Sequence, residues 1–467
     1  MAMVGLAAVA AVPDALDVDD IAPQWSVEAV PGEVPAVPWW ETMQDVQLAE
    51  IVGQGLAGNP DLDAAYGRLE TAEATTLVAF AGLVPNASFD LTTSGQPADV
   101  VFRCAVGPIS PDEFASLQNN QGDDPSGLCF TGSALFNFRW GLDVFGRGIL
   151  NHKAARFEAE AARGDQAATR LMISGTIASA YLDAVSGAQQ VTILEEQLAS
   201  QLALLEVLEL RYETGGATGL DVLQQRQTVA STRAALPPAR LAAASQSRVL
   251  AALLGRGIGD LPDLPITLPD PVDAPPIGTP AQLVTRRPDL QAAQGRLVAS
   301  RARRDAAVRG LLPTVSVNAN AGWQYALASE LSALGVWGIG GAVSVPLFNG
   351  GSGDGQVRQA RGTYRATVSA WDTALLNAIR DVENGVVRDF EQAERHDAVS
   401  RQVEAARAAF GEARQRYLQG IDSFLSVLAA QSGLQAAELS LVQAHRDRLA
   451  ARVQLWTALG GDTGVSP

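Results

Sequence analysis

Lysine, histidine and cysteine, which many catalytic centres use, are scarce in this chain and lie far apart in the sequence. Lysine occurs once, at Lys153, and the three histidines and two cysteines stand singly. The run GGSGDG at 350–355 has neither the GxGxxG order nor the lysine of a phosphate-binding loop, and its glycines are better explained by a strand-to-helix turn. The sequence also contains neither H-E-x-x-H nor G-x-S-x-G. We therefore expect a protein without enzymatic activity, cofactor or metal site.

Two acidic residues, Asp221 and Asp422, stand out because each belongs to a segment that predicts a turn between helices. The segments RYETGGATGLDVL, from residue 211, and RYLQGIDSFLSVL, from residue 416, both run from Arg-Tyr through glycine and an acid to Val-Leu. Acids gathered around a narrow pore favour cations over anions. Asp is also frequent in ordinary solvent-exposed turns. From these residues alone, a functional acid and a plain turn residue remain open alternatives.

The overall charge excludes one large class of partner. The 467 residues include 34 Lys and Arg against 51 Asp and Glu, which gives a net charge of −17. Binding to a nucleic-acid backbone depends on basic patches that neutralise phosphates. We therefore expect no nucleic-acid partner. The longest apolar run, over residues 1–12, is shorter than the roughly 20 residues of a membrane-spanning helix.

The chain contains an internal duplication. Residues 59–91, which begin NPDLDAAYGRLE, align with residues 287–319, which begin RPDLQAAQGRLV, at an offset of 228. The two turn segments align at an offset of 205. The difference of 23 residues indicates an extra segment in the first copy, which we place around residues 99–130. Ordered matches over two halves of the chain indicate a two-repeat fold.

Four segments alternate between apolar and polar residues, a pattern typical of β-strands with one apolar and one polar face. Two lie in each repeat, around 87–94, 136–144, 315–323 and 337–347. Each has about 9–11 residues, the length of a tilted strand that crosses a membrane. Aromatic residues at the ends of the segments, such as Trp140 and Trp323, fit the interfacial belts of a membrane protein. A half-buried soluble sheet would show the same alternation.

Two segments without proline, rich in good helix formers, predict very long helices over about 147–213 and 355–417. At 1.5 Å per residue, each would be a rod of about 100 Å. Such rods would pack along heptad-like seams, as in coiled coils. Shorter helices are expected before the strands and after each turn, over about 46–83, 281–311, 220–254 and 425–459.

Prolines are expected to interrupt this pattern at two places. Pro237 and Pro238 should bend or break the first return helix. The proline-rich stretch 261–280 cannot form a regular helix and is interpreted as a linker between the repeats. The apolar start of the chain resembles the core of a secretory signal. The expected organisation is a signal remnant with an N-terminal segment, the first repeat, a linker, the second repeat and a C-terminal tail, over 1–45, 46–254, 255–280, 281–460 and 461–467.

Four strands per chain are too few to close a membrane barrel, and an open sheet edge is not viable in lipid. Three chains would supply twelve strands, an even number within the known range. Two chains would supply eight, and such a barrel is filled by its own side chains. We therefore expect an α+β protein of two repeats, whose trimer forms a 12-stranded β-barrel continued by a long α-helical coiled-coil tunnel.

Taken together, these features resemble the TolC-type outer-membrane efflux channels, closest to their OprM-like branch. The resemblance rests on the NPDL and RPDL repeat starts, the motifs LDVFGRG at 142–148 and VPLFNGG at 345–351, and the two Arg-Tyr turns. It covers nearly the whole chain, from Pro23 to Gly460. It implies a homotrimer in the outer membrane, with its helical tunnel in the periplasm, that conducts exported compounds passively. The implied partners are a periplasmic adaptor protein, an inner-membrane RND-type transporter and outer-membrane lipid.

The same resemblance implies roles for the two turns. They would converge at a periplasmic gate, where threefold symmetry makes Asp422 a ring of three acids. Asp221 and Tyr417 match a family pair that bridges neighbouring hairpins. Positions where some family gates carry further acids are occupied here by Ser426 and Ala429. The resemblance also implies docking of the adaptor at the hairpin turns, through Arg211, Tyr212, Gly215, Gly216, Arg416 and Gly420.

The cysteines give one departure from the family and one further prediction. OprM-like members usually carry a lipid-modified cysteine at the mature N-terminus, and no cysteine lies near residue 1 here. Cys104 and Cys129 lie in the segment between the first two strands, which the implied topology places outside the cell. Because disulfides persist in oxidising surroundings, we expect these two cysteines to be bridged.

Two classes of function are therefore compared. The leading one is the outer-membrane exit duct of a tripartite efflux system, recruited by a pump that selects the cargo. The other is a soluble structural coiled-coil or adaptor protein, in which the alternating segments form a small buried sheet. Outer-membrane fractionation distinguishes the two, because only the first class requires lipid.

Overall fold

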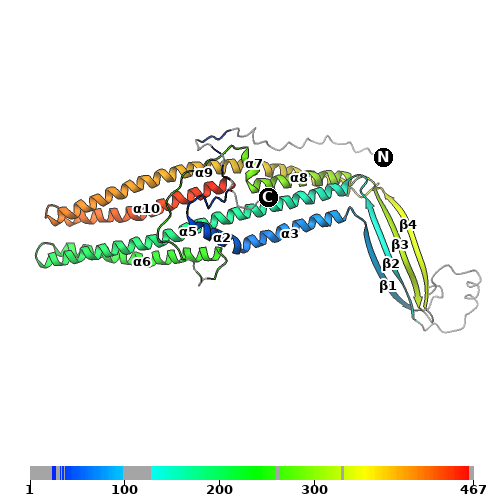
Figure 1. Ribbon diagram of the computed structural model, residues 1–467, viewed down its shortest axis with the longest axis horizontal. Helices are drawn as coiled ribbons and strands as arrows, with labels where there is room; N and C mark the ends of the chain where they lie inside the picture. Colours follow the sequence, from blue (N-terminus) through cyan, green and yellow to red (C-terminus); the bar gives the residue numbers. More distant parts are fainter. Residues whose placement is uncertain are drawn as a thin grey trace, which may run out of the picture. The chain divides into compact units, whose positions relative to one another are not determined.

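The helices and strands follow the same order twice along the chain (Figure 1). The computed structural model describes residues 24–27, 32, 34–35, 37–97, 128–257, 260, 263–327 and 331–461. The first set of elements comprises α2 (Val46–Gly58), α3 (Pro60–Ala81), β1 (Asn86–Pro97), β2 (Leu128–Leu142), α5 (Arg147–Glu213) and α6 (Gly219–Leu253). The second set comprises α7 (Gln282–Arg286), α8 (Pro288–Arg309), β3 (Thr314–Leu327), β4 (Leu331–Ser344), α9 (Ser352–Leu418) and α10 (Phe424–Ala458). This order confirms the two-repeat fold.

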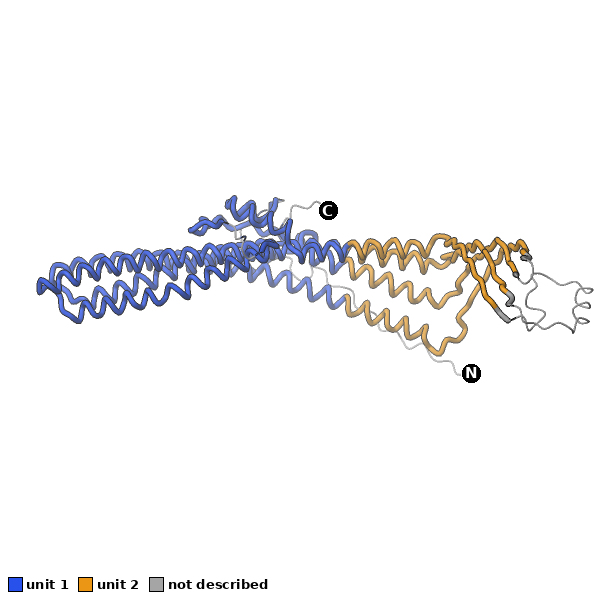
Figure 2. The backbone as a smooth tube through the Cα atoms, turned by 90° about the horizontal axis from the view of Figure 1, so that it is seen from below, with its two compact units in different colours: residues 1–69, 161–294, 368–467 blue, residues 70–160, 295–367 orange. Residues whose placement is uncertain are grey.

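The chain divides into two compact units, each built from both repeats (Figure 2). Unit 1 comprises residues 1–69, 161–294 and 368–467, and it contains α6, α10 and the parts of α5 and α9 from residues 161 and 368 onward. Unit 2 comprises residues 70–160 and 295–367, and it contains the four strands. The duplication in the sequence is therefore not a pair of separate domains, because each unit needs elements from both copies.

Each repeat begins with a pair of helices rather than with the single helix that the sequence suggested. The breaks fall at Asn59 and Arg287, whose backbones are extended. Each of these residues precedes a proline, which disfavours the helical conformation one residue earlier. Both side chains then donate to the end of a return helix, Asn59 Nδ2 to Leu253 O at 3.0 Å and Arg287 Nη1 to Ala458 O at 3.0 Å. These bonds satisfy carbonyl groups that a helix end leaves unpaired.

The long helices have the lengths that the sequence predicted. The helices α5 and α9 each contain 67 residues, and α6 and α10 each contain 35. The glycine-rich run at 350–355 lies where α9 begins, as a turn between strand and helix. Within the described ranges, no helix is long and apolar enough to cross a membrane.

The prolines act differently at the two places where an interruption was expected. No described residue between 255 and 280 belongs to a helix or strand, as predicted. By contrast, α6 is continuous through Pro237 and Pro238, which corrects the expectation of a broken helix. A proline removes the hydrogen bond to the carbonyl four residues earlier. Here these carbonyls belong to Arg233 and Ala234, which are exposed, so solvent can bond them. The neighbouring Leu236 is buried, and its packing stabilises the helix at this point.

The strands form one antiparallel sheet in the order β1-β2-β3-β4, with a different chemistry on each face. Directly opposite residues on neighbouring strands share a face. One row across the sheet joins Phe89, Phe136, Ala321 and Trp337. The two phenylalanine rings are in contact, with centroids 4.8 Å apart. Phe89, Phe136 and Trp337 are 54%, 61% and 81% exposed, so this apolar face is open to the surroundings of the chain.

The opposite face of the sheet is polar. The next row across it joins Ser88, Asn137, Asn320 and Gly338. Asn137 Nδ2 donates to Asp90 Oδ2 at 2.7 Å, and Ser88 Oγ donates to the same oxygen at 3.0 Å. An apolar face combined with a polar, hydrogen-bonding face is what a strand between lipid and a water-filled lumen requires.

The sequence-based disulfide prediction lies outside the described residues. Cys104 belongs to the undescribed range 98–127, together with most of the extra segment of the first repeat. Cys129 lies in β2, where it pairs with Gln96, but its side chain is not described. The bridge between the two cysteines therefore stays a prediction.

Candidate functional site

The two hairpin ends, where α5 turns into α6 and α9 turns into α10, have the same backbone design. Gly215 and Gly420 have φ angles of 78° and 73°. Glycine adopts this left-handed conformation without the steric penalty that other residues meet. The N–H of the following residue then bonds a carbonyl five residues earlier, that of Arg211 at 2.7 Å and that of Arg416 at 2.9 Å. Both long helices thus end in the Schellman arrangement, at the turns that the sequence predicted.

The return helices begin differently, because the acidic residue occupies a different place in each repeat. In α6, Thr218 Oγ1 accepts from the Asp221 N–H at 3.3 Å, and Asp221 Oδ2 accepts from the Thr218 N–H at 2.9 Å. This is a capping box. In α10, Asp422 Oδ1 accepts from the Ser423 N–H at 2.8 Å and from Ser426 Oγ at 2.9 Å. Both acids therefore stabilise the start of a helix within their own chain.

Asp422 is held as a carboxylate by its own hairpin. The hydrogen bond from the Ser423 N–H, the hydroxyl of Ser426 and the charge of Arg416 together lower the pKa of Asp422 below its ordinary value. The side chain lies at the surface of the turn. Within one chain, the acid is therefore ionised and available to solvent or to another molecule.

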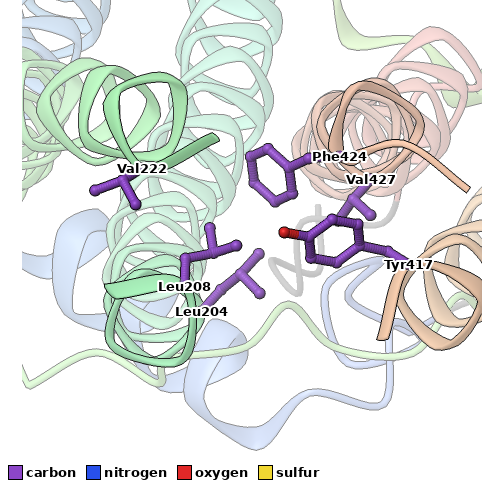
Figure 3. Close-up of a cluster of buried hydrophobic side chains, with 6 residues drawn as sticks. All are labelled: Leu204, Leu208, Val222, Tyr417, Phe424 and Val427. Atoms are coloured by element: carbon purple, nitrogen blue, oxygen red, sulfur yellow. The ribbon is translucent and has the colours of Figure 1, made fainter. Parts of the chain in front are cut away.

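A buried apolar cluster joins the two hairpins close to their turns (Figure 3). Its members come from all four hairpin helices: Leu204, Leu208, Val222, Tyr417, Phe424 and Val427. The Tyr417 ring is only 7% exposed, and its centroid lies 5.3 Å from that of Phe424. Burial of these side chains holds the ends of α5–α6 and α9–α10 against each other.

Two polar residues reach the Tyr417 side chain across this contact. Tyr417 Oη donates to Asp221 Oδ2 at 3.5 Å, so the structure brings together the pair that the sequence singled out. Burial and the nearby Asp221 carboxylate raise the pKa of the Tyr417 hydroxyl. The Arg211 guanidinium lies 5.2 Å from the centre of the Tyr417 ring, and its Nη1 donates to Leu418 O at 3.2 Å.

The contacts of Arg211 and Thr218 were not recognised from the sequence. Arg211 was assigned only to a docking turn, and nothing in its local pattern indicates a ring some 200 residues further along. Thr218 carries a usable signal, because Thr-x-x-Asp before an apolar run is a capping-box pattern. The other predicted docking residues lie at the surface of the turns, where Tyr212 is 54% exposed.

The repeat offers a matched test of what links the hairpins. At 3.5 Å the hydroxyl bond of Tyr417 is long, so Tyr417→Phe should cost less than about 1 kcal/mol of unfolding free energy. Tyr417→Ala removes the ring from the cluster and should cost about 3 kcal/mol or more. Tyr212 is exposed and occupies the position of Tyr417 in the first repeat, so Tyr212→Ala should change the unfolding free energy by less than about 0.5 kcal/mol. Denaturant unfolding of the purified protein measures all three. Equal losses for Tyr417→Phe and Tyr417→Ala would show that the hydroxyl, not the ring, holds the hairpins.

Fold and site together define a class of protein. The described residues contain no group of three or more His, Cys, Asp or Glu that could hold a metal ion. The features that the structure does contain are a sheet with an exposed apolar face and a polar face, very long helical hairpins, and acidic residues at the hairpin turns. This combination is that of an outer-membrane channel.

Comparison with known proteins identifies the family. The family described as outer membrane efflux protein matches residues 51–256 and 279–461. The chain is 27% identical to the pyoverdine export outer membrane protein OpmQ of Pseudomonas putida over 430 residues, which cover 92% of this chain and 88% of that protein. It is 28% identical to the toluene efflux pump outer membrane protein TtgF of Pseudomonas putida over 432 residues, 91% of this chain and 85% of that protein. The chain belongs to the outer membrane efflux protein family.

Solved structures agree with this assignment. The outer-membrane channel OprN matches with a TM-score of 0.79 and 26% identity, over 97% of this chain and 98% of that chain. The outer membrane protein VceC of Vibrio cholerae matches with a TM-score of 0.75 and 26% identity, over 92% of this chain and 99% of that chain. The protein is therefore an outer-membrane transport protein of the TolC type and not an enzyme, which confirms the resemblance noted from the sequence.

Proposed function

We propose that this protein is the outer-membrane exit duct of a tripartite efflux system. It conducts exported small molecules passively from the periplasm to the outside, after docking to a periplasmic adaptor and an RND-type inner-membrane pump. The observation that supports this function best is the two-faced sheet. Its exposed apolar row fits lipid, and its polar row fits a water-filled lumen. A soluble coiled-coil protein would have to cover the apolar row.

Assembly follows from the edges of the sheet. Among the residues that the structure describes, the outer strands β1 and β4 each have one side without a partner strand. An open edge in lipid leaves backbone groups unsatisfied. Three chains that pair β1 with β4 of the next chain close a barrel of twelve strands, and the three pairs of hairpins then form the wall of a periplasmic tunnel.

Two measurements on the purified protein test this function. The mass of the protein in detergent should correspond to three chains, and planar bilayers that contain it should show discrete conductance steps. Both results follow from a closed barrel with a water-filled lumen. A monodisperse monomer that stays in solution without detergent and is silent in bilayers would contradict the proposal.

The gate proposal concerns the hairpin turns. Asp422 would face the periplasmic mouth of the trimer, where threefold symmetry makes a ring of three carboxylates. Carboxylates close together raise one another's pKa, but the hydrogen bonds from Ser423 and Ser426 act in the opposite direction. The ring would therefore keep its charge and attract cations into the mouth. Asp221, Tyr417 and Arg211 would hold the two hairpins of one chain together in the closed gate.

Asp422→Asn should weaken the cation preference of the channel. The change removes up to three carboxylates per trimer, while the asparagine oxygen can still accept from Ser423 and Ser426 and keep the turn. The effect should be largest at low salt, where screening is weakest. Ion selectivity in planar bilayers measures it. Asp354→Asn, at the opposite end of α9, removes the same charge as a control and should leave selectivity unchanged. If both variants behave like the parent, Asp422 is a helix-capping residue only.

The adaptor would dock on the outer surfaces of the hairpin turns. The proposed contact residues are Arg211, Tyr212, Gly215, Gly216, Arg416 and Gly420. The first hairpin also exposes apolar side chains close to its turn. Leu210, Leu220 and Leu223 are each more than 60% exposed. Exposed apolar side chains with charged residues around them are typical of protein-binding surfaces.

The two cysteines should form a disulfide in the mature protein. Cys104 and Cys129 are 25 residues apart, and closing a loop of that length would stabilise the protein by about 3–4 kcal/mol on the chain-entropy estimate. Thiol labelling of the folded, unreduced protein should detect no free thiol. The same sample should give two thiols per chain after reduction and denaturation, which is the control. Two reactive thiols before reduction would disprove the bridge.

A further inference from the structure

A cavity of about 410 Å³ lies between α5, α9 and α10 of unit 1. Its size falls in the range of small-molecule binding sites. Apolar side chains from all three helices form much of its wall, among them Ile193, Val403, Phe410 and Leu441. The cavity lies in the last third of α5 and α9 and in the middle of α10, and its Phe410 also packs against the apolar cluster that joins the hairpins.

Two hydrogen-bond acceptors in the cavity wall have no partner among the described residues. Gln431 is only 3% exposed, and its Oε1 is buried without a hydrogen bond. His445 Nε2 is likewise buried and unpaired. The other ring nitrogen of His445 bonds the Pro269 carbonyl, so it carries the proton and leaves Nε2 as an acceptor in the neutral ring. Buried acceptors without a donor are uncommon in folded proteins, and these two line the same cavity.

The charged groups of the wall are mainly acidic. Glu196 and Glu438 line the cavity, with Arg407 as the guanidinium that faces it. Glu438 accepts from Gln197 Nε2 at 3.1 Å and from Arg407 Nη2 at 3.4 Å. Burial and the adjacent His396, whose ring centroid lies 5.2 Å away, lower the pKa of His445, so this histidine adds no positive charge at neutral pH. The cavity therefore combines acceptors, a net negative charge and apolar walls.

We propose that this cavity binds a small organic cation, with a primary ammonium or guanidinium group on an apolar body. The cationic group would donate to Gln431 Oε1 beside the carboxylate of Glu438, which lies two helical turns further along the same helix. The apolar body would pack against Phe410 and the aliphatic residues of the wall. Such a ligand supplies the donor that Gln431 Oε1 lacks and the charge that the carboxylates favour. The binding requires no transport, so its failure would leave the proposed exit-duct function intact.

The first test compares ligands of one shape and different charge. Phenethylammonium is the probe, and hydrocinnamate and phenethyl alcohol carry the same apolar body with an anionic or neutral head. Titration calorimetry on the full-length protein in detergent should show saturable binding of one phenethylammonium per chain. Because all three compounds enter micelles through the same apolar body, the comparison separates the site from the detergent. No saturable binding, or equal binding of the three compounds, would overturn the proposal and leave a cavity filled by water only.

The second test removes single groups from the wall. Gln431→Met keeps the length of the side chain and removes the unpaired acceptor, so phenethylammonium binding should weaken about fivefold or more without a lower unfolding temperature. Glu438→Gln should weaken it at least as much, since it removes the charge and keeps the oxygen that accepts from Gln197. Gln225→Met is the matched control, because Gln225 is a buried glutamine of α6 with an unpaired Oε1 that does not line the cavity. Unchanged binding in both wall variants, or an equal loss in Gln225→Met, would refute the assignment.

Discussion

Phe136→Arg should prevent most of the protein from assembling in the membrane, whereas Asn137→Arg, one residue further along β2, should be tolerated. Phe136 lies in the apolar row of the sheet and is 61% exposed in the chain. An arginine on the lipid face of a barrel costs about 2–4 kcal/mol near the bilayer centre. Each of the three chains carries this free-energy cost, so the cost for the assembled trimer is three times as large.

Asn137→Arg is the matched control because the same side chain is introduced on the opposite face. There the new guanidinium points to the polar row and can pair with Asp90, which already accepts from Asn137 at 2.7 Å. Heat-modifiable mobility of the trimer in detergent and the amount of protein in the outer-membrane fraction measure the difference. Equal loss in both variants would show that the two faces are not divided between lipid and lumen.

Arg452→Met should destabilise the protein by about 3–5 kcal/mol, because it leaves a buried carboxylate without its partner. Arg452 and Asp389 are 5% and 6% exposed and connect α10 with α9. Two bonds join them, Nε to Oδ1 at 2.8 Å and Nη2 to Oδ2 at 3.1 Å. Arg452 Nη1 also donates to Val272 O at 2.6 Å, which ties the linker to the helices.

A second substitution separates the pair from the packing around it. Arg452→Met combined with Asp389→Leu removes both charges and should recover a large part of the loss, since apolar replacement of a buried ion pair is often near neutral. The control is Arg226→Met, which breaks the exposed pair with Glu209 at 2.7 Å and should cost less than about 1 kcal/mol. Denaturant midpoints of the variants measure all of these. A loss in Arg452→Met no larger than in Arg226→Met would mean that the buried pair contributes little.

Most of the fold could be predicted because its signals are local. The alternation through Phe136 and Asn137 repeats every two residues, which assigns both the strand and its two faces. The helix over 147–213 was predicted with the bounds that α5 has, because the segment contains no proline and is rich in good helix formers. The two turns could be predicted because Gly215 and Gly420 adopt a left-handed backbone conformation that few other residues adopt.

The predictions that were wrong concern where helices end, which depends on both the conformational preference of the local sequence and the packing of the helix. Pro237 and Pro238 lower helix propensity, but α6 continues because its buried face packs along the hairpin and the freed carbonyls face solvent. The breaks at Asn59 and Arg287 were missed although each precedes a proline. At both positions the preference of a residue before proline for an extended backbone decides the structure. The side chain of each of these residues also caps a return helix.

By itself, the sequence determined the repeats, the two-faced strands, the long helices, the turns and the class of protein. Only the tertiary structure decided which side chains meet. Tyr417 reaches Asp221 across 196 positions, Arg452 reaches Asp389 across 63, and the cavity at Gln431 collects residues from three helices. Periodicity assigns a residue to a face of its own element, but it carries no information on which other element covers that face. That choice depends on how side chains of different helices fill the space between them, which is a property of the packed molecule.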